Sequence, residues 1–255
     1  QGGGGLEHLN STLLTSSPKS AGGGDMRWLQ YVSHEYFHAF NVKRLRPIQL
    51  GPFDYEHPPK TPSLWISEGL TTYYGNLMVS RGGLGTQQDV LNALSKAITS
   101  VQNSPGRHVQ TLEQASLDIF STGGSGEGGN PNTNVSYYDK GLIVGLLLDA
   151  RIQHATNGGK SLDDMMRLAY KRYGGAHGFT PQQWVATASD VAGTDLTAFF
   201  HTLLQTTDEM DYSEALNWFG LRFAPSDNPE AAWTLEIRPD ATPQQSARLD
   251  RLTQP

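Results

Sequence analysis

Two histidines four residues apart, with a glutamate directly after the first, carry the clearest chemistry in the sequence. They are His34, Glu35 and His38, in the stretch HEYFH. On an α-helix, residues i and i+4 lie on the same face, so both imidazoles could bind one Zn²⁺ ion at about 2.0–2.1 Å. Glu35 would lie about 100° further round the helix, where its carboxylate could take a proton from a metal-bound water. The spacing predicts a zinc site in which Glu35 is the general base.

A third metal ligand is expected from Glu68, in the later stretch WISEGL. A lone glutamate is usually a solvated surface residue. Here it stands just behind the apolar residues Trp65 and Ile66, in a segment with helical character, and this favours a buried role. A helix packed antiparallel to the first would present Glu68 to the same ion, so we expect one Zn²⁺ bound by Glu68 and the two histidines.

The elements that must position these residues are predominantly helical, because apolar side chains recur at helical spacing along most of the chain. Capping residues and Pro or Gly breakers set the expected boundaries. The helix predicted at 139–155 is apolar on most sides and should be buried. The first two of the other helices are expected from Met26 to before Pro47 and at 63–78. The third should begin at the Thr86 cap, with Asp89 in the capping-box position, and end before Pro105. Three more are expected at 161–173, at 181–191 and at 195–204 with Thr194 as its cap, followed by a strand around 233–237 and a short polar helix.

Composition limits the partners of this 255-residue chain. The formal net charge is −6 and the longest basic cluster is the short group Lys43, Arg44 and Arg46, so a nucleic-acid partner is not expected. These three cations are expected to form ion pairs or to cap the first helix rather than to bind substrate. The longest apolar run, 142–148, is too short to span a membrane. There is no cysteine, so any metal must be held by His, Asp or Glu.

Several stretches together resemble the glycyl aminopeptidase family of zinc metallopeptidases, which is related to the aminopeptidase N clan. HEYFHAFNVKRLRP at 34–47 and WISEGLTTYYG at 65–75 are similar to the family's two metal-binding helices. SYYDKG at 136–141 is similar to the YEKG motif of the clan, and GLEH at 5–8 resembles the family's GGLEH segment. The resemblance implies a mainly α, thermolysin-like gluzincin catalytic domain with a few strands near the N-terminus.

The resemblance also implies a role for each matching residue. The two histidines and Glu68 would be the zinc ligands, and Glu35 the base. Tyr138 would donate a hydrogen bond to the oxyanion of the reaction, and Glu7 would bind the free α-ammonium of a peptide substrate. The protein would then be an aminopeptidase that prefers N-terminal glycine or alanine. From the residues alone, Tyr138 could instead be a core aromatic beside Tyr137, and Glu7 a solvated loop residue.

The chain is expected to form a single catalytic domain over residues 1–255, because its 37% of hydrophobic residues suffice for one core. Residues 1–24 would form a strand/loop segment at the substrate edge, and 25–82 would carry the two ligand helices. Residues 121–134 would be a flexible loop, a candidate lid, and 135–255 a helical C-terminal part. The β-rich domain that usually precedes this region in the family, and the PDZ domain that often follows it, are not visible. The abrupt start at Gln1 without a signal peptide suggests that an upstream segment is missing, and a periplasmic, secreted or cytoplasmic location stays open.

Three other functions stay open at this point. A zinc endopeptidase would share the metal site but would also cleave peptides with a blocked N-terminus. A non-catalytic peptide-binding module on a degenerate peptidase fold would bind peptides without turnover. A structural helical domain, in which the two histidines are unconnected, would hold no metal at all.

Overall fold

The computed structural model describes residues 4–15, 25–52, 56–119, 129–228 and 233–254. Within these ranges the fold is mainly helical, as predicted, with antiparallel pairs of short strands at the beginning and towards the end of the chain. The elements are β1 (Gly4–Glu7), β2 (Thr12–Thr15), α2 (Met26–Phe37), the 3₁₀ turn η1 (Ile48–Leu50), the π-helix η2 (Trp65–Leu70), α3 (Thr71–Arg81), α4 (Gln87–Gln102), the 3₁₀ turn η3 (Pro105–His108), α5 (Leu112–Leu117), α6 (Tyr137–Ala155), α7 (Leu162–Tyr173), α8 (Pro181–Ala192), α9 (Thr197–Gln205), α10 (Ser213–Phe219), β3 (Leu221–Phe223), β4 (Leu235–Ile237) and α11 (Pro243–Thr253).

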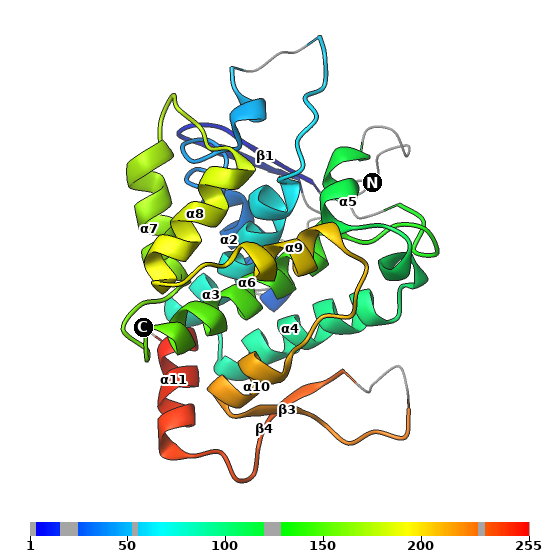
Figure 1. The fold of residues 1–255 in the computed structure, drawn as a ribbon, viewed down its shortest axis with the longest axis vertical. Coiled ribbons are helices and arrows are strands. Elements are labelled where there is room, and N and C mark those ends of the chain that lie inside the picture. Colours follow the sequence, from blue (N-terminus) through cyan, green and yellow to red (C-terminus); the bar gives the residue numbers. More distant parts are fainter. Residues whose placement is uncertain (1–3, 16–24, 53–55, 120–128, 229–232, 255) are drawn as a thin grey trace.

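Helix α6 is the centre of the hydrophobic core and runs through the middle of the molecule in Figure 1. The π-helix η2 and helices α3, α4, α5, α7, α8 and α10 all pack against it. Its residues from Lys140 to Ala150 are all buried. A helix that is apolar on most sides is stable only when neighbours cover most sides, and the predicted buried helix at 139–155 is therefore confirmed.

Helix α2, which carries the HEYFH stretch, ends at Phe37, so the prediction of a helix reaching nearly to Pro47 is wrong. The amides of Ala39 and Phe40 donate to carbonyls three residues back, which tightens the turn and stops the helix. The buried Asn41 then donates from its side-chain Nδ2 to the carbonyl of Ile66 at 2.7 Å. The chain leaves the helix axis at this point because Asn41 is bonded to the next ligand-bearing element.

The helix predicted at 63–78 is present, but its first part, from Trp65 to Leu70, is a π-helix that continues into α3. This element crosses α6 with no side chain between the two backbones. A β-carbon on Gly141 would lie only 2.7 Å from the Trp65 carbonyl oxygen and 2.9 Å from Cα of Gly69. Only glycine at both positions permits so close an approach, and the contact fixes η2 against α6.

The remaining sequence predictions had mixed outcomes. The capping box of Thr86 and Asp89 on α4, the strands near the N-terminus, and the final strand and polar helix are all confirmed. Helix α9 begins at Thr197, and Thr194 is not its cap. The side chain of Asp195 accepts from the Thr197 amide at 2.9 Å and holds the turn before the helix instead.

Several short elements were not expected from the sequence, namely α5, α10 and β3. Their apolar residues occupy only one or two helical turns or alternations, which is too short for a periodic pattern. The predicted flexible loop at 121–134 lies partly outside the described residues, since only 129–134 are described and they form turns.

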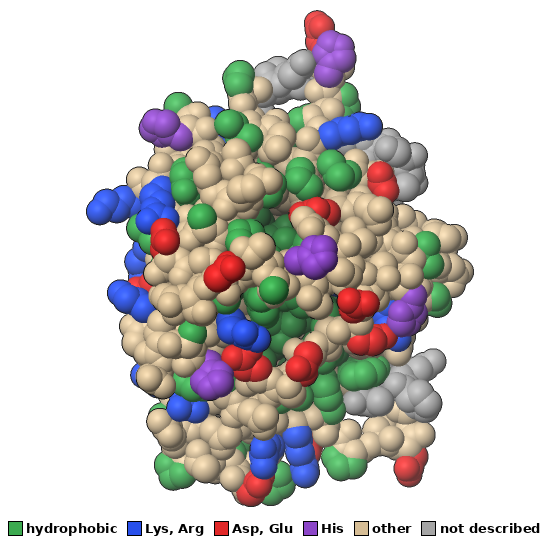
Figure 2. Space-filling model, in the orientation of Figure 1, with side chains coloured by type: hydrophobic (Ala, Val, Ile, Leu, Met, Phe, Trp, Pro, Cys, Tyr) green, Lys and Arg blue, Asp and Glu red, His purple; other side chains and the backbone are tan. Residues whose placement is uncertain are grey.

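Charged side chains of both signs are interspersed over the face shown in Figure 2, without a large basic patch on that face. Among the described residues, none of the helices combines the length and the apolar character needed to cross a membrane.

The close crossing of η2 and α6 leads to a stability prediction. Gly141→Ala should lower the free energy of unfolding by roughly 1–3 kcal/mol, because the new methyl group overlaps the backbone of the other helix. Alanine is otherwise about 1 kcal/mol better than glycine inside a helix, so a neutral or stabilising effect would contradict the close contact. Urea unfolding measures the difference. Gly4→Ala is the control, because the nearest atom to its β-carbon is 3.8 Å away.

Candidate metal centre

Three side chains that can bind a metal ion converge where the end of α2 meets η2. The Nε2 atoms of His34 and His38 are 3.0 Å apart, and each lies 3.3 Å from Oε2 of Glu68. In a tetrahedral zinc site with bonds of about 2.0–2.1 Å, ligand atoms are about 3.3 Å from one another. The three residues predicted from sequence are therefore brought together at a spacing that fits an ion of this size.

The hydrogen bonds behind the two imidazoles fix which nitrogen faces the centre. Nδ1 of His38 lies 3.0 Å from the carbonyl oxygen of Asn41, which can only accept, so Nδ1 carries the hydrogen. Thr72 donates its hydroxyl hydrogen to the carbonyl of Glu68 at 2.8 Å, and its oxygen is left to accept from Nδ1 of His34 at 3.2 Å. In the neutral rings both Nε2 atoms thus present lone pairs towards a carboxylate oxygen. Such a set of donors suits a cation at its centre.

Burial and mutual contact shift the titration of these groups. Burial lowers the pKa of His38, but the hydrogen bond and charge of Glu68 outweigh it and raise the pKa to about 9. Burial raises the pKa of Glu68, but the hydrogen bonds and charges of the two histidines outweigh burial. The pKa of Glu68 is therefore lowered well below its usual value. The carboxylate therefore attracts positive charge into the centre, either as protons on the imidazoles or as a metal ion that replaces them.

Glu35 lies beside this centre and not among its ligands. Its side chain is buried, and a β-carbon on Gly5 of strand β1 would overlap its carboxyl group. Burial raises the pKa of Glu35, the negative charges of Glu68 and Glu7 add to the increase, and the two histidines oppose it. A carboxyl group with a raised pKa next to a metal centre is suited to accepting and releasing a proton.

Of the two adjacent tyrosines at the start of α6, one lies in the core and the other contacts the candidate site. Tyr137 is buried in the core at 4% exposure. The ring of Tyr138 stacks on the His34 ring, with centroids 6.1 Å apart and planes at 24°. Burial raises the pKa of Tyr138 and the charge of Glu68 raises it further, so the phenol stays protonated and can donate a hydrogen bond.

The region that holds these groups also matches known proteins. Residues 27–144 match the family model described as M61 glycyl aminopeptidase. This stretch, called the M61 region below, is similar to the M61 family. The matched range includes the three ligand candidates, Glu35 and Tyr138, and it begins after Glu7. Among curated proteins, no relative matches the sequence.

A solved structure is similar over most of this chain. It is the crystal structure of an aminopeptidase N family protein from Idiomarina loihiensis, with a TM-score of 0.79 and 27% sequence identity. The similarity covers 86% of this chain and 39% of that one, so this chain spans about two fifths of the length of that relative. The M61 match and this structure together support a peptidase.

Glu7, which lies before the M61 region, is placed near the metal centre by the hairpin of β1 and β2. This hairpin packs against α2. Oε1 of Glu7 lies 3.5 Å from Nζ of Lys43, just after the end of α2. The negative charge of Glu7 also contributes to the raised pKa of Glu35 and of His38. The structure thus brings Glu7 to the edge of the same centre, with a cation beside it.

Two residues of the M61 region that support the centre were not identified from the sequence, Asn41 and Thr72. Asn41 bonds His38 through its carbonyl and holds η2 through its side chain. Thr72 follows Glu68 by four residues, which places its hydroxyl on the same helix face as the carboxylate. That spacing was visible in the sequence for Thr72. The contact of Asn41 depends on the early end of α2, which was not.

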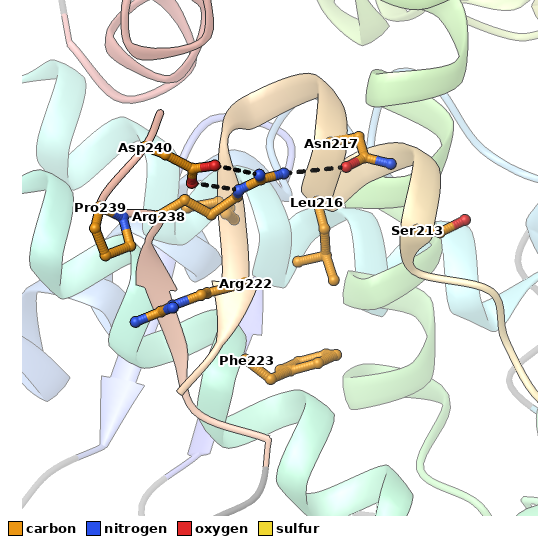
Figure 3. Close-up of a pocket in the computed structure, with 9 residues that line it drawn as sticks. Ser213, Leu216, Asn217, Arg222, Phe223, Arg238, Pro239 and Asp240 are labelled. Carbon is orange, nitrogen blue, oxygen red and sulfur yellow. Dashed lines mark hydrogen bonds and ion pairs between the residues drawn. The ribbon is translucent and has the colours of Figure 1, made fainter. Parts of the chain in front are cut away.

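A separate hollow of about 640 Å³ lies between α10 and the β3–β4 hairpin, away from the metal centre. Figure 3 shows two arginines on its wall. Arg238 bonds Asp240 at 2.8 Å, and Arg222 bonds Glu236 at 2.6 Å. None of the predicted site residues lines this hollow, and its cations are already paired with carboxylates.

The bond between Thr72 and His34 leads to a prediction about metal affinity. Thr72→Val keeps the side-chain shape but removes the acceptor for Nδ1–H of His34, and should weaken Zn²⁺ binding about 10–100-fold. Competition with a chromophoric chelator measures the dissociation constant. Thr72→Ser is the control, since it retains the hydroxyl and should bind Zn²⁺ within a few-fold of the unmodified protein. Equal affinity in the valine variant would show that Thr72 does not orient the ligand.

Proposed function

We propose that this chain is a zinc-dependent aminopeptidase that hydrolyses N-terminal residues, glycine or alanine in preference, from peptides. The convergence of two imidazole lone pairs and one carboxylate oxygen at 3.0–3.3 Å, with a buried glutamate beside them, supports it most directly. The preference for glycine is supported by the description of the M61 family alone. Peptides with a free N-terminus are then the substrates.

The ligand set assigns the chemistry that a bound ion supplies. Zinc at His34, His38 and Glu68 would polarise the scissile carbonyl and lower the pKa of a water to about 7. The Glu35 carboxylate takes a proton from the attacking water and passes it to the nitrogen of the leaving amine. Its raised pKa keeps the protonated form accessible between these two transfers.

Two further residues act on the substrate rather than on the water. The hydroxyl of Tyr138 donates to the carbonyl oxygen of the substrate as negative charge develops there. Glu7 accepts from the α-ammonium group of the substrate and thereby sets which peptide bond lies over Glu35. An aminopeptidase differs from an endopeptidase in requiring this second contact, because the metal centre alone does not select a free N-terminus.

The role of Glu35 is tested by Glu35→Gln. The variant should retain Zn²⁺ at one ion per chain but lose about 10²–10⁴ in kcat, because the amide cannot accept the proton of the water. Metal content by mass spectrometry and hydrolysis of glycine p-nitroanilide give the two quantities. A variant with zinc and a near-normal rate would refute the assignment of the base. A native protein that binds peptides but has no turnover would instead indicate a peptide-binding module.

The role of Glu7 is tested by Glu7→Gln with two kinds of substrate. For glycyl and alanyl anilides with a free amine, kcat/KM should fall at least about tenfold, because the α-ammonium loses its carboxylate partner. Zinc content should stay unchanged. The unmodified protein should not cleave the N-acetylated anilides. Comparable cleavage of free and acetylated substrates would indicate a zinc endopeptidase, with the metal centre retained and the aminopeptidase proposal rejected.

A further inference from the structure

Glu7 lies on a short β-hairpin, although its proposed role requires an accurately fixed carboxylate. β1 and β2 have four residues each, and most of their side chains are exposed. β1 begins with Gly4 and Gly5, which have the largest backbone freedom of any residue type. A two-stranded hairpin of this length is marginally stable by itself, so contacts to the rest of the protein must hold it.

Two adjacent basic residues supply such contacts from the turn after α2. Nζ of Lys43 lies 3.5 Å from Oε1 of Glu7 at the end of β1. Arg44 donates from Nη2 to Oδ1 of Asn10, in the turn between the strands, at 2.9 Å. The other arm of Arg44 donates to the carbonyl of Ala39 at 2.6 Å, which bonds the same side chain to the turn after α2. Both contacts therefore hold the hairpin at its turn end, at Glu7 and at Asn10.

The position of Lys43 is itself set by the metal centre. Its amide donates to the carbonyl of His38 at 3.0 Å, so its backbone is bonded directly to a candidate ligand. The side chains of Lys43 and Glu7 are 16% and 23% exposed, so the pair is screened by water less than a surface ion pair. The distance from the metal centre to Glu7 thus depends on the bond between these two charges.

We propose that Lys43 is the positioning residue for Glu7: its ammonium holds Oε1 of the carboxylate, and the substrate's α-ammonium binds the acceptor positions that remain. This deepens the role of Glu7 and rests on the proposed aminopeptidase function. A carboxylate offers about four acceptor positions on its two oxygens, so two ammonium groups can share it. A lysine provides a compact point charge, whereas an arginine fork tends to engage both carboxylate oxygens at once.

Two effects of Lys43 on substrate binding oppose each other. Its charge repels the incoming α-ammonium, but the carboxylate lies between the two cations and offsets most of that repulsion. Its contact also restricts Glu7 to one arrangement, so the substrate does not have to order the carboxylate when it binds. Since the ordered carboxylate contacts the α-ammonium equally before and during the reaction, we expect the ordering to outweigh the repulsion and to lower KM.

The test is a double-mutant cycle between Lys43 and Glu7 in the zinc-loaded protein. Lys43→Met removes the charge and keeps most of the apolar stem. It should raise KM for glycine p-nitroanilide about tenfold, with a much smaller change in kcat, because the α-ammonium contact is equally present before and during the reaction. In the Glu7→Gln background the same substitution should have no further effect, since Lys43 acts through that carboxylate. Lys96→Met, on the exposed face of α4, is the matched control and should match the unmodified protein.

The other outcomes overturn either the role of Lys43 or the role of Glu7 on which it rests. If Lys43→Met folds, holds zinc and keeps a normal KM, Lys43 does not position Glu7. If it lowers activity equally in the presence and absence of the Glu7 carboxylate, it acts elsewhere, and the proposal is also overturned. If Glu7→Gln alone leaves the free-amine substrate unaffected, the amine-binding role of Glu7 fails first, and the proposal for Lys43 fails with it. Lys43→Gln replaces the methionine variant if thermal unfolding shows that the latter is destabilised.

Discussion

The direct backbone contact between η2 and α6 is the constraint on which the candidate metal centre depends. Gly69 and Gly141 meet with no side chain between them. Glu68 directly precedes the first glycine, and Tyr138 stands one helical turn before the second, so the same contact that packs the helices sets the distance between carboxylate and phenol. A methyl group at either position would push the two helices apart and separate these side chains. The same contact therefore determines both the packing of the two helices and the geometry of the candidate site.

Further along the same helical element, polar contacts add to the close packing. Tyr73 donates to the buried Asp149 of α6 at 3.0 Å, and Tyr74 donates to Asp163 of α7 at 2.9 Å. Burial raises the pKa of both phenols well above the usual value, so each remains a donor. Arg81 also bonds Asp163 at 3.0 Å and places a cation beside that carboxylate. These bonds fix the rotation of α3 about its axis, which a smooth apolar contact would leave less determined.

The sequence was sufficient for the parts of the site that depend on local spacing. The i, i+4 histidines and a glutamate inside an apolar helix led to the residues that the structure brings together, and the mainly helical class is confirmed. What depends on long-range contacts was not predictable. Helix α2 stops at Phe37 because the side chain of Asn41 donates a hydrogen bond to the carbonyl of Ile66, 25 residues further along. No proline or glycine marks that point in the sequence. The π-helix of η2 was likewise not predicted, since its apolar spacing does not distinguish it from an α-helix.

Because α2 ends early, the turn that follows it contacts both the candidate metal centre and the hairpin of β1 and β2. Within seven residues the chain carries a candidate ligand, His38, the carbonyl that orients it, at Asn41, and the two cations Lys43 and Arg44 that hold the hairpin. Had the helix continued to Pro47, successive residues would point round its axis and could not all face the centre. The irregular turn lets the Asn41 carbonyl contact His38 while Lys43 and Arg44 contact the hairpin. It also means that metal site and hairpin share one segment, so a shift of this turn would move the ligand and the carboxylate of Glu7 together and preserve the distance between them.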